Sequence, residues 1–388
     1  MMYFDAYTII SIALAAISCG LLGIGLLNLA RFPRLPKVST PQPESARCSV
    51  LVPARNEERC IEACVRSLCL QDDLNTEVIV LDDGSTDATP QILARLQQEF
   101  PALRVITGQP LPQGWIGKSW ACDQLSKAAT GDLLLFTDAD TEHAPTTVRR
   151  TREYMRTHDV ALLTMVPFEE LGSFGEHVVI PMVHTLYFAY LPNDLILHHR
   201  SVSFSAANGQ FMCFTRSAYQ TVRGHECVKN SLVEDVFLAK AVKRAGLRIS
   251  LVDGSDAVSC RMYTNAREVT EGFSKNFFPA TSYSIPLTLL FLGHLFTTYV
   301  APVGVFVAGI AASREDLALL AGIQLVALAL IRGMIAYRFS MPWWHIFLAP
   351  VTGVWSMFIG INSIRWAYSR RGATWKGRAY SQQGTHHA

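Results

Sequence analysis

Two acidic segments each follow a short apolar run, an arrangement that suits binding of a metal ion and a phosphate-bearing ligand. Asp138-Ala139-Asp140 follows the apolar residues 132–137, and Asp82-Asp83 follows residues 77–81. Carboxylate oxygens suit Mg²⁺ or Mn²⁺, whose remaining positions are filled by water and phosphate. Asp82 and Asp83 can accept hydrogen bonds from a base N–H or a ribose hydroxyl. A nucleotide diphosphate with a bridging metal ion accounts for both segments, although an Asp-x-Asp triplet can also simply cap a helix.

A third acidic pair, Glu234-Asp235, begins an amphipathic segment that continues through Leu238, Ala241 and Val242. An aspartate beside a substrate can act as a general base. Negative side chains are also favoured at the positive N-terminus of any helix. The spacing by itself leaves both interpretations open.

The segments that must position these acids alternate between strand-like and helix-like patterns. Apolar runs at 48–52, 77–81, 103–107 and 132–137 alternate with helical patterns that reach Leu70, reach Phe100 and span 118–129. This alternation predicts an α/β fold with a parallel sheet that helices cover on both faces. Ligands of such sheets bind beyond the carboxyl ends of the strands. Residues 53–57, 82–87 and 138–140 are therefore expected to form one site.

Both flanks of this polar region are strongly apolar. Half of the 388 residues are hydrophobic and only 17% are charged, against about 25% in typical soluble proteins. The net charge of +2 gives no electrostatic reason to expect a nucleic-acid partner. The nine cysteines form no C-x-x-C pair, so we expect buried, reduced thiols.

The N-terminal apolar run, Ala6–Ala30, predicts a membrane anchor. It carries no charge and is followed by Arg31, Arg34 and Lys37. A helix of this length crosses a hydrocarbon core of about 30 Å. The flanking cations place the following domain in the cytoplasm, and a cleaved signal peptide is the alternative.

Three further apolar stretches, Ile285–Ala312, Leu317–Phe339 and Pro342–Trp366, precede a basic C-terminal tail. If all three cross the bilayer, the basic tail lies outside, against the usual charge distribution. Pro302 or Pro350 can turn one stretch into a re-entrant or interfacial piece, and we favour that solution.

The segment Phe174–His199 is apolar and aromatic but interrupted by prolines. We interpret it as an interfacial segment at the entrance for an acceptor, with a core helix as the alternative. Its histidines have no convincing metal-ligand spacing.

The successive motifs Val52–Glu58 (VPARNEE), Leu81–Asp87 (LDDGSTD) and Thr137–Asp140 (TDAD) resemble those of family-2 glycosyltransferases. The resemblance implies a GT-A fold and a nucleotide-diphosphate sugar, expected to be a UDP-sugar, as donor. It also implies that Asp140 is the principal metal ligand, with Asp138 beside it, for Mg²⁺ or Mn²⁺. The implied nucleotide-sugar site contains Pro53, Arg55, Glu57, Asp82, Asp83, Lys118 and Asp138.

Glu234-Asp235 resembles the catalytic Glu-Asp motif of the same family. The resemblance implies that Asp235 is the general base that takes a proton from an acceptor hydroxyl, with Glu234 as its catalytic neighbour. Attack opposite the leaving diphosphate then inverts the anomeric configuration. Asn208–Met212 stands where related enzymes carry an acceptor motif, which implies acceptor-side roles for Gly209 and Gln210. A turn before a strand explains that segment equally well.

The expected acceptor is a membrane lipid of the isoprenoid type. Processive members carry Gln-x-x-Arg-Trp after the base, whereas this chain has Cys260-Arg261-Met262-Tyr263. Pro110–Lys118 and Trp375–Tyr380 instead resemble a membrane-bound branch associated with carotenoid and hopanoid glycosylation. Trp375, Lys376 and Arg378 are expected to return to the active site, with a lipid-headgroup anchor as the alternative.

We therefore expect a multi-pass protein of the cell (inner) membrane. Its expected parts are an anchor and linker (1–45), a cytoplasmic GT-A catalytic domain (46–282), membrane helices (283–368) and a basic tail (369–388). The alternatives are a polysaccharide synthase, which the few polar residues of the terminal segments disfavour, and a scaffold with a dead transferase domain. The intact acids at positions 83, 138, 140 and 235 disfavour the scaffold.

Overall fold

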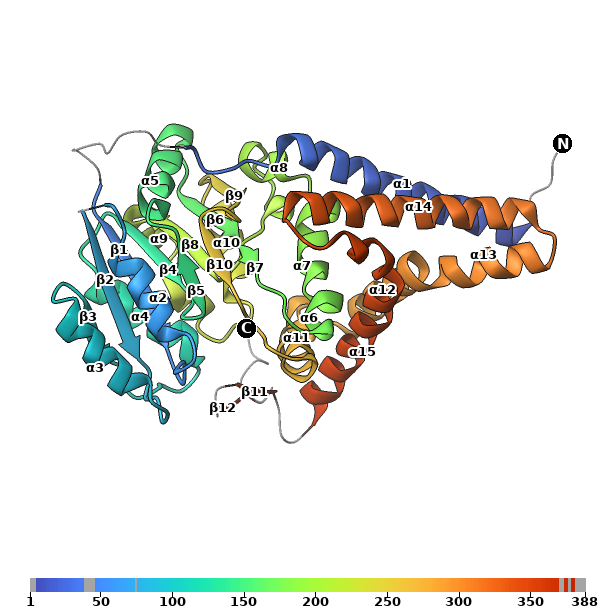
Figure 1. Cartoon of the computed structure of the whole chain (residues 1–388). Helices are drawn as coiled ribbons and strands as arrows, with labels where there is room; N and C mark the ends of the chain where they lie inside the picture. The colour runs from blue at the N-terminus through green and yellow to red at the C-terminus, as the bar shows by residue number, and fades with distance from the viewer. Residues whose placement is uncertain (1–4, 38–45, 74, 370–372, 376–377, 381–388) are drawn as a thin grey trace.

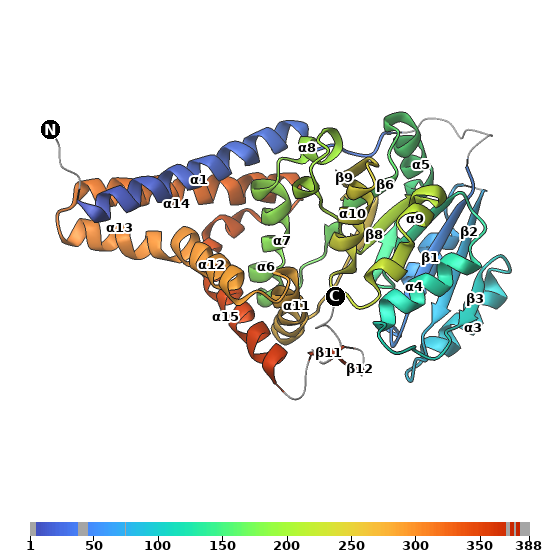
Figure 2. The same ribbon diagram turned by 180° about the vertical axis from the view of Figure 1, so that it is seen from behind.

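The structure is a computed structural model that describes residues 5–37, 46–73 and 75–369, and the backbone of residues 373–375 and 378–380. An α/β domain occupies one end of an elongated molecule, and long apolar helices extend away from it (Figures 1 and 2). The polar region and the apolar flanks of the sequence thus also lie apart in the structure.

A seven-stranded sheet in the order β3-β2-β1-β4-β8-β6-β9 forms the centre of the α/β domain. Its strands are β1 (Cys48–Ala54), β2 (Thr76–Asp82), β3 (Arg104–Thr107), β4 (Leu133–Thr137), β6 (Leu162–Val166), β8 (Phe211–Thr215) and β9 (Ile249–Asp253). The first four are the strands expected from the sequence, and they run parallel. Strand β8 is antiparallel to both β4 and β6. A small second sheet contains β5 (Thr141–His143), β10 (Val258–Cys260) and β7 (Phe168–Glu169).

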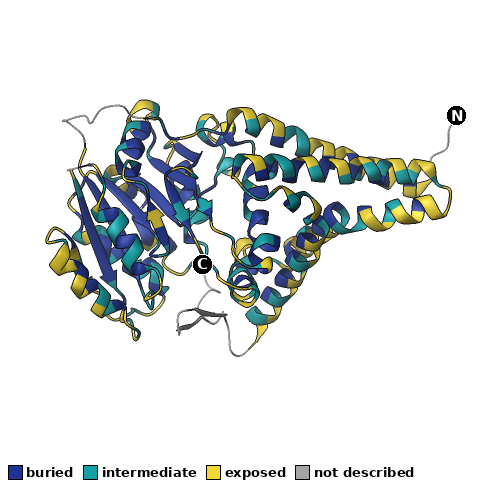
Figure 3. Ribbon diagram, viewed as in Figure 1, coloured by how far each residue is buried: buried dark blue, intermediate teal, exposed yellow. Residues whose placement is uncertain are grey.

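Helices cover the sheet, and its strands are among the most buried parts of the molecule (Figure 3). Helices α2 (Ile61–Cys69), α3 (Thr89–Glu99) and α4 (Gly117–Ala128) are the three expected after β1, β2 and β3. The others are α5 (Thr147–His158), α9 (Arg216–Thr221) and α10 (Glu234–Arg244), with 3₁₀ turns η2 (Val202–Phe204) and η3 (Gly224–Val228). The nine cysteines are free thiols, as expected, but the expectation that they are buried is wrong for Cys19 and Cys227, which are exposed.

Three helical segments among the described residues are long and apolar enough to cross a membrane: Ala6–Arg31, Ile285–Ala311 and Glu315–Arg338. The first is α1 and the third is α14. The middle one consists of α12 (Ile285–Leu295), a π-helical turn η4 (Phe296–Val300) and α13 (Ala301–Ala311), and Pro302 lies in the first turn of α13. Helix α14 packs against both α1 and α13. Their outward faces expose large apolar side chains, including Leu290 and Leu319.

The third apolar stretch near the C-terminus, Pro342–Trp366, does not form one of these three candidate spans. It forms the turn η5 (Trp343–Phe347) and α15 (Ala349–Tyr368), which packs against α11 (Ala266–Ala280). This helix is not among the three candidate spans of the described residues. Along the long axis, the hairpin of β11 (Ala373–Trp375) and β12 (Arg378–Tyr380) lies toward the α/β domain and away from the far ends of α13 and α14 (Figure 1). This arrangement fits the expectation that one of the three stretches does not cross.

The segment from Phe174 to His198 connects the two parts of the molecule. It contains α6 (Phe174–Val179), α7 (Pro181–Thr185), the π-helical turn η1 (Leu186–Tyr190) and α8 (Asn193–His198). The Asn28 side chain of α1 donates to the carbonyls of Phe188 at 2.7 Å and Leu191 at 2.8 Å. Phe188 is fully buried, whereas Phe174 and Leu186 are exposed. The segment is therefore partly core and partly surface, between the two interpretations of the sequence.

A buried carboxylate joins the apolar helices to the sheet. Asp253, at the end of β9, is 1% exposed and pairs with Arg338 of α14 at 2.8 Å and with Arg34 at 3.0 Å. Its backbone N–H donates to the carbonyl of Pro33 at 2.8 Å. Asp253 thus ties the end of α14 and the segment that follows α1 to the edge of the sheet.

We expect Asp253→Asn to lower the thermal unfolding temperature of the purified protein. Breaking a buried ion pair costs about 3–5 kcal/mol, and the lower end applies because Arg34 is 56% exposed. The control is Asp194→Asn, which removes an exposed pair with Arg31, worth about 0–1 kcal/mol. Equal unfolding temperatures for the two variants would show that the ion pairs of Asp253 do not stabilise the fold.

Candidate active site

The loops that follow β1 and β2 are hydrogen-bonded to each other along their length. Asp83 N–H donates to the Ala54 carbonyl at 2.8 Å, and the Arg55 guanidinium donates to the carbonyls of Asp83 and, at 3.1 Å, Gly84. Asn56 adopts a left-handed conformation with φ of 53° and accepts a hydrogen bond from Thr86 N–H at 2.8 Å. These contacts explain why the two motifs need polar residues at fixed positions.

The residues expected to bind a nucleotide share this pair of loops. Pro53 lies in β1 opposite Leu81, and Glu57 N–H donates to the Thr89 hydroxyl at 2.8 Å. Asp82 accepts a hydrogen bond from Ser85 N–H at 2.9 Å, so it also shapes its own turn. Asp83 is 6% exposed. The structure thus brings Pro53, Arg55, Glu57, Asp82 and Asp83 together at the carboxyl ends of the parallel strands, as the sequence predicts.

Lys118 joins two acids that lie far apart in the sequence. Its Nζ is 2.7 Å from Asp138, directly after β4, and 3.0 Å from Glu234, at the start of α10. Burial alone would lower the pKa of Lys118, but the two carboxylates raise it well above its ordinary value. Burial would raise the pKa of Glu234, and Lys118 lowers it. Lys118 and Glu234 are therefore both ionised at neutral pH.

Asp235 lies beside this cluster and is held by two backbone donors. Its Oδ2 accepts from Gly209 N–H at 3.0 Å and its Oδ1 from Val236 N–H at 2.8 Å. Burial and the neighbouring Glu234 raise the pKa of Asp235 to about 6. A carboxyl with this pKa is mostly ionised at neutral pH and is a better proton acceptor than an ordinary aspartate.

The backbone at Gly209 lies close to both Asp235 and Lys118. A Cβ at this position would lie 3.2 Å from Lys118 Nζ and 3.5 Å from Asp235 Oδ2. A side chain here would therefore push Lys118 Nζ away by a few tenths of an ångström. The segment also makes the turn before β8 that was the alternative interpretation.

Glu169 is a candidate that the sequence interpretation missed. It lies in β7, is 6% exposed, and accepts a hydrogen bond from the Gln210 side chain at 3.0 Å. Burial raises the pKa of Glu169 to about 8, with Gln210 opposing and the charge of Asp140 adding to the rise. An acidic pair, Glu169-Glu170, two residues after the apolar strand Leu162–Val166 was the available signal.

The segment from Phe174 to His198 places Tyr187 of η1 near the same acids. Its hydroxyl donates to the Ala207 carbonyl at 2.9 Å. Burial raises the pKa of Tyr187, and the charges of Asp235 and Glu169 raise it further. The segment between the apolar helices and the sheet therefore forms one wall of the site.

The donor set fits a divalent cation that binds together with a phosphate ligand. The described residues contain no group of three or more His, Cys, Asp and Glu side chains that could hold a metal by themselves. Mg²⁺ is commonly bound by one or two carboxylates plus substrate phosphate. Asp138 and Asp140 supply such a pair, and the Asp140 charge acts on Glu169 nearby.

Part of the expected tail site lies outside the described residues. Lys376 is one of these, and only the backbone of Trp375 and Arg378 is described, as paired positions of the β11–β12 hairpin. Their role at the active site stays a prediction.

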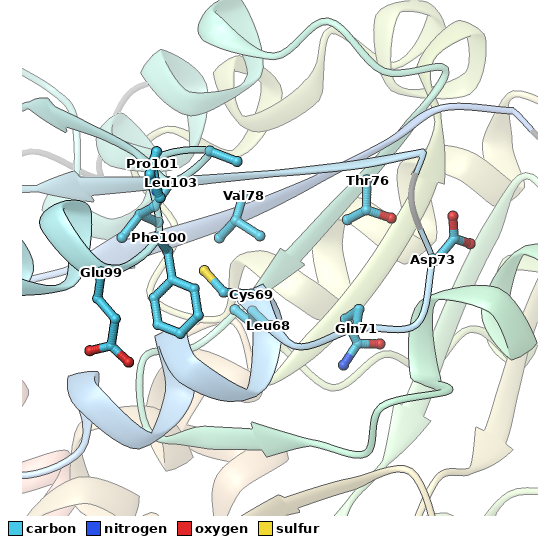
Figure 4. A pocket seen from close by; sticks show the side chains of 11 residues that line it. Leu68, Cys69, Gln71, Asp73, Thr76, Val78, Glu99, Phe100, Pro101 and Leu103 are labelled. Carbon is cyan, nitrogen blue, oxygen red and sulfur yellow. The ribbon is translucent and has the colours of Figure 1, made fainter.

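A separate cavity of about 210 Å³ lies at the other end of β2 (Figure 4). Leu68, Thr76 and Phe100 are among the residues that line it. Because Thr76 is the first residue of β2, this cavity is not part of the site at the carboxyl ends of the strands.

Comparison with known proteins agrees with this geometry. Residues 49–222 match the family model described as glycosyl transferase family 2. The 4,4'-diaponeurosporenoate glycosyltransferase of Staphylococcus haemolyticus is 28% identical over 249 residues, which cover 63% of this chain and 64% of that protein. The protein of the same name from Staphylococcus aureus (strain USA300) is 26% identical over 236 residues, 59% of this chain and 60% of that protein. The chain thus matches less than two thirds of the length of these relatives.

A solved structure shares the fold over almost the whole chain. It is a mannosyltransferase from Pyrobaculum calidifontis in complex with GDP-Man and Mn²⁺. The TM-score is 0.55 at 18% sequence identity, and the match covers 94% of this chain and 100% of the other. At this identity the similarity describes the fold, including the arrangement of α/β domain and helices.

Proposed function

We propose that this chain is a family-2 glycosyltransferase that transfers a sugar from a nucleotide-diphosphate sugar to a membrane lipid of the isoprenoid type, with inversion. The match of residues 49–222 to the family-2 model and the similarity to two carotenoid-associated glycosyltransferases support this proposal. The observation that carries the proposal is the position of Asp235. Its carboxylate is held by Gly209 beside the Lys118–Asp138 pair, next to the wall that Tyr187 forms toward the apolar helices.

The donor side of the proposal uses the loops after β1, β2 and β4. Arg55, Asp82 and Asp83 would contact the nucleotide, and Lys118 would turn from Asp138 toward the diphosphate. Mg²⁺ or Mn²⁺ at Asp138 and Asp140 would neutralise charge on the diphosphate, which makes it a better leaving group. The mannosyltransferase with a similar fold was solved with GDP-Man and Mn²⁺, which supports this assignment.

The acceptor side of the proposal uses Asp235, Glu234, Gly209 and Gln210. The acceptor oxygen attacks the anomeric carbon, the bond to the diphosphate breaks, and the hydroxyl proton passes to Asp235. A base with a pKa of about 6 is useful for a hydroxyl acceptor, whereas a carboxylate acceptor is already ionised. The relatives are named for diaponeurosporenoate, so we propose an isoprenoid acceptor and use the dependence on Asp235 to distinguish hydroxyl from carboxylate.

We also propose an arrangement in the cell membrane with the α/β domain in the cytoplasm. Arg31, Arg34 and Arg338 lie at the domain ends of α1 and α14, which fits the preference of cations for the cytoplasmic side. With α1, Ile285–Ala311 and α14 as the three spans, the C-terminal tail returns to the side of the active site. A nucleotide sugar then arrives from water while the acceptor arrives from the bilayer.

The rate is expected to fall below a pH of about 6. The base must be ionised, so kcat/KM decreases about tenfold per pH unit below the pKa of Asp235. Glu234→Gln removes a charge that raises this pKa, so the acidic limb should move to lower pH. The pH–rate profile measures this shift, and the exposed Glu226→Gln is the control that should leave the limb unchanged. A limb that moves to higher pH in Glu234→Gln would contradict the proposed role of Asp235.

The direct test uses the full-length protein in detergent or nanodiscs with a panel of nucleotide sugars and an isoprenoid lipid extract. Mass spectrometry should detect a lipid whose mass increases by one sugar residue, with release of one nucleoside diphosphate per product. Formation of a polymer, or sugar transfer only to water-soluble acceptors, would overturn the proposed acceptor class.

A further inference from the structure

A buried arginine on α14 lacks partners for most of its hydrogen-bond donors. Arg332 is 2% exposed, and its Nε donates to the His345 carbonyl at 3.3 Å. Its Nη1 and Nη2 atoms have no hydrogen-bond partner, and no ion pair within the described residues includes Arg332. Burying a guanidinium without a counter-charge costs several kcal/mol of folding free energy. We therefore expect Arg332 to bind a group that is not part of the chain.

Two buried histidines beside Arg332 are also incompletely hydrogen-bonded. His184 of α7 is 1% exposed, packs edge-on against Phe339, and has no partner at either ring nitrogen. His345 of η5 is 1% exposed; its Nε2 lies 2.8 Å from His177 Nδ1, and its own Nδ1 has no partner. Burial lowers the pKa of both His184 and His345 to about 4, and the charge of Arg332 contributes. Both rings are therefore neutral, and each can donate one hydrogen bond.

The cluster lies near the domain end of α14, which is a candidate membrane span. Arg332 precedes Arg338 by six residues on α14, a rise of about 9 Å along the helix, and Arg338 pairs with Asp253 of the sheet. The neighbouring turn η5 exposes Trp343 (71%) and Phe347 (68%), and aromatic residues are enriched at membrane interfaces.

The chemistry of the unpaired atoms identifies the missing partner as an acceptor with negative charge. Guanidinium nitrogens only donate, so the four N–H groups of Nη1 and Nη2 need oxygens. Water supplies hydrogen bonds but no counter-charge, whereas a phosphate or carboxylate supplies both, and arginine binds such groups through two parallel bonds. Ionisable residues inside membrane spans are rare and commonly mark functional sites.

We propose that Arg332, with His184 and His345, binds the anionic headgroup of a bilayer lipid. Turn η5, which carries His345 and lies over α14, borders this site. The site is distinct from the acids around Asp235, so it can be present whether or not the proposed transfer reaction is correct.

Native mass spectrometry of the full-length protein released from nanodiscs of mixed phosphatidylcholine and phosphatidylglycerol tests the site directly. Wild type should retain phosphatidylglycerol, and Arg332→Met should lose occupancy by about tenfold or more. Arg332→Met should still fold, because replacing an unpaired buried charge by an apolar group of similar volume is neutral or stabilising. Arg365→Met, which removes an exposed arginine of α15, is the matched control and should retain the lipid.

A second measurement separates a lipid site from a site for free phosphate or water. The unfolding temperature of wild type should be higher in nanodiscs with phosphatidylglycerol than in phosphatidylcholine alone, and Arg332→Met should lose this difference. Inorganic phosphate added to phosphatidylcholine nanodiscs should not reproduce the shift. Equal lipid retention by wild type and Arg332→Met, or a shift that phosphate alone produces in full, would overturn the proposal.

Discussion

Replacing Asp235 with asparagine is expected to lower kcat by about 10³-fold, within the range of 10²–10⁴ for loss of a general base. The amide keeps the shape of the side chain and can still meet one of its backbone donors, Gly209 or Val236, but it cannot take a proton. Nucleotide-sugar binding should stay within about twofold of wild type, because this residue acts on the acceptor side. Steady-state kinetics and equilibrium titration of the donor measure the two effects.

The same variant distinguishes the acceptor group. With a hydroxyl acceptor the loss should be full, and with a carboxylate acceptor it should be small, because no proton has to be removed. Glu226→Gln, an exposed acid on η3, is the control and should retain wild-type kinetics. Normal turnover of a hydroxyl acceptor by Asp235→Asn would reject Asp235 as the base.

Replacing Asp140 with asparagine is expected to reduce activity by about 10²–10³-fold, since a metal ion that stabilises a leaving group supplies several kcal/mol. Addition of a chelator to wild type should produce a similar loss, and Mg²⁺ or Mn²⁺ should restore it. The second readout is binding of Mn²⁺ in the presence of a nucleoside diphosphate, which Asp140→Asn should weaken. This measurement does not depend on knowing the acceptor.

A matched control for Asp140 exists on the same strand. Asp132 stands just before β4, at its opposite end, and is exposed. Asp132→Asn should therefore leave metal binding and turnover unchanged. Full activity of the wild type in chelator would contradict the metal role of Asp140 regardless of how the variants behave.

The local features of the donor side could be read directly from the sequence. Apolar runs of strand length predict β1 to β4 within two residues, because β1, β2 and β4 are almost continuously buried and must be continuously apolar. Since parallel strands all end at one edge, the motifs after β1, β2 and β4 had to meet there. The contacts between Arg55 and the Asp83–Gly84 loop follow from that topology.

Contacts between distant segments could not be read in the same way. Lys118 meets Glu234 across more than a hundred residues, and this pairing depends on η3, which packs against both α4 and α10. Glu169 lies in β7 and its only sequence signal is the acidic pair Glu169-Glu170. Its raised pKa comes from burial, which only the packed structure provides. In the sequence, Arg332 is a single charged residue within an apolar stretch. Its burial between α7 and η5 is visible only in the structure.

The sequence by itself therefore determined the class of fold, the edge of the sheet that carries the acids and the division into polar domain and apolar helices. These follow from the period of apolar residues and from their total length, which are properties of local segments. The length and composition of α15 leave it outside the candidate spans. Only the tertiary structure decided that α15 packs along α11 and which charges neutralise one another. The physical reason is that burial and pairing depend on the sum of all neighbours, and most of those neighbours are distant in the chain.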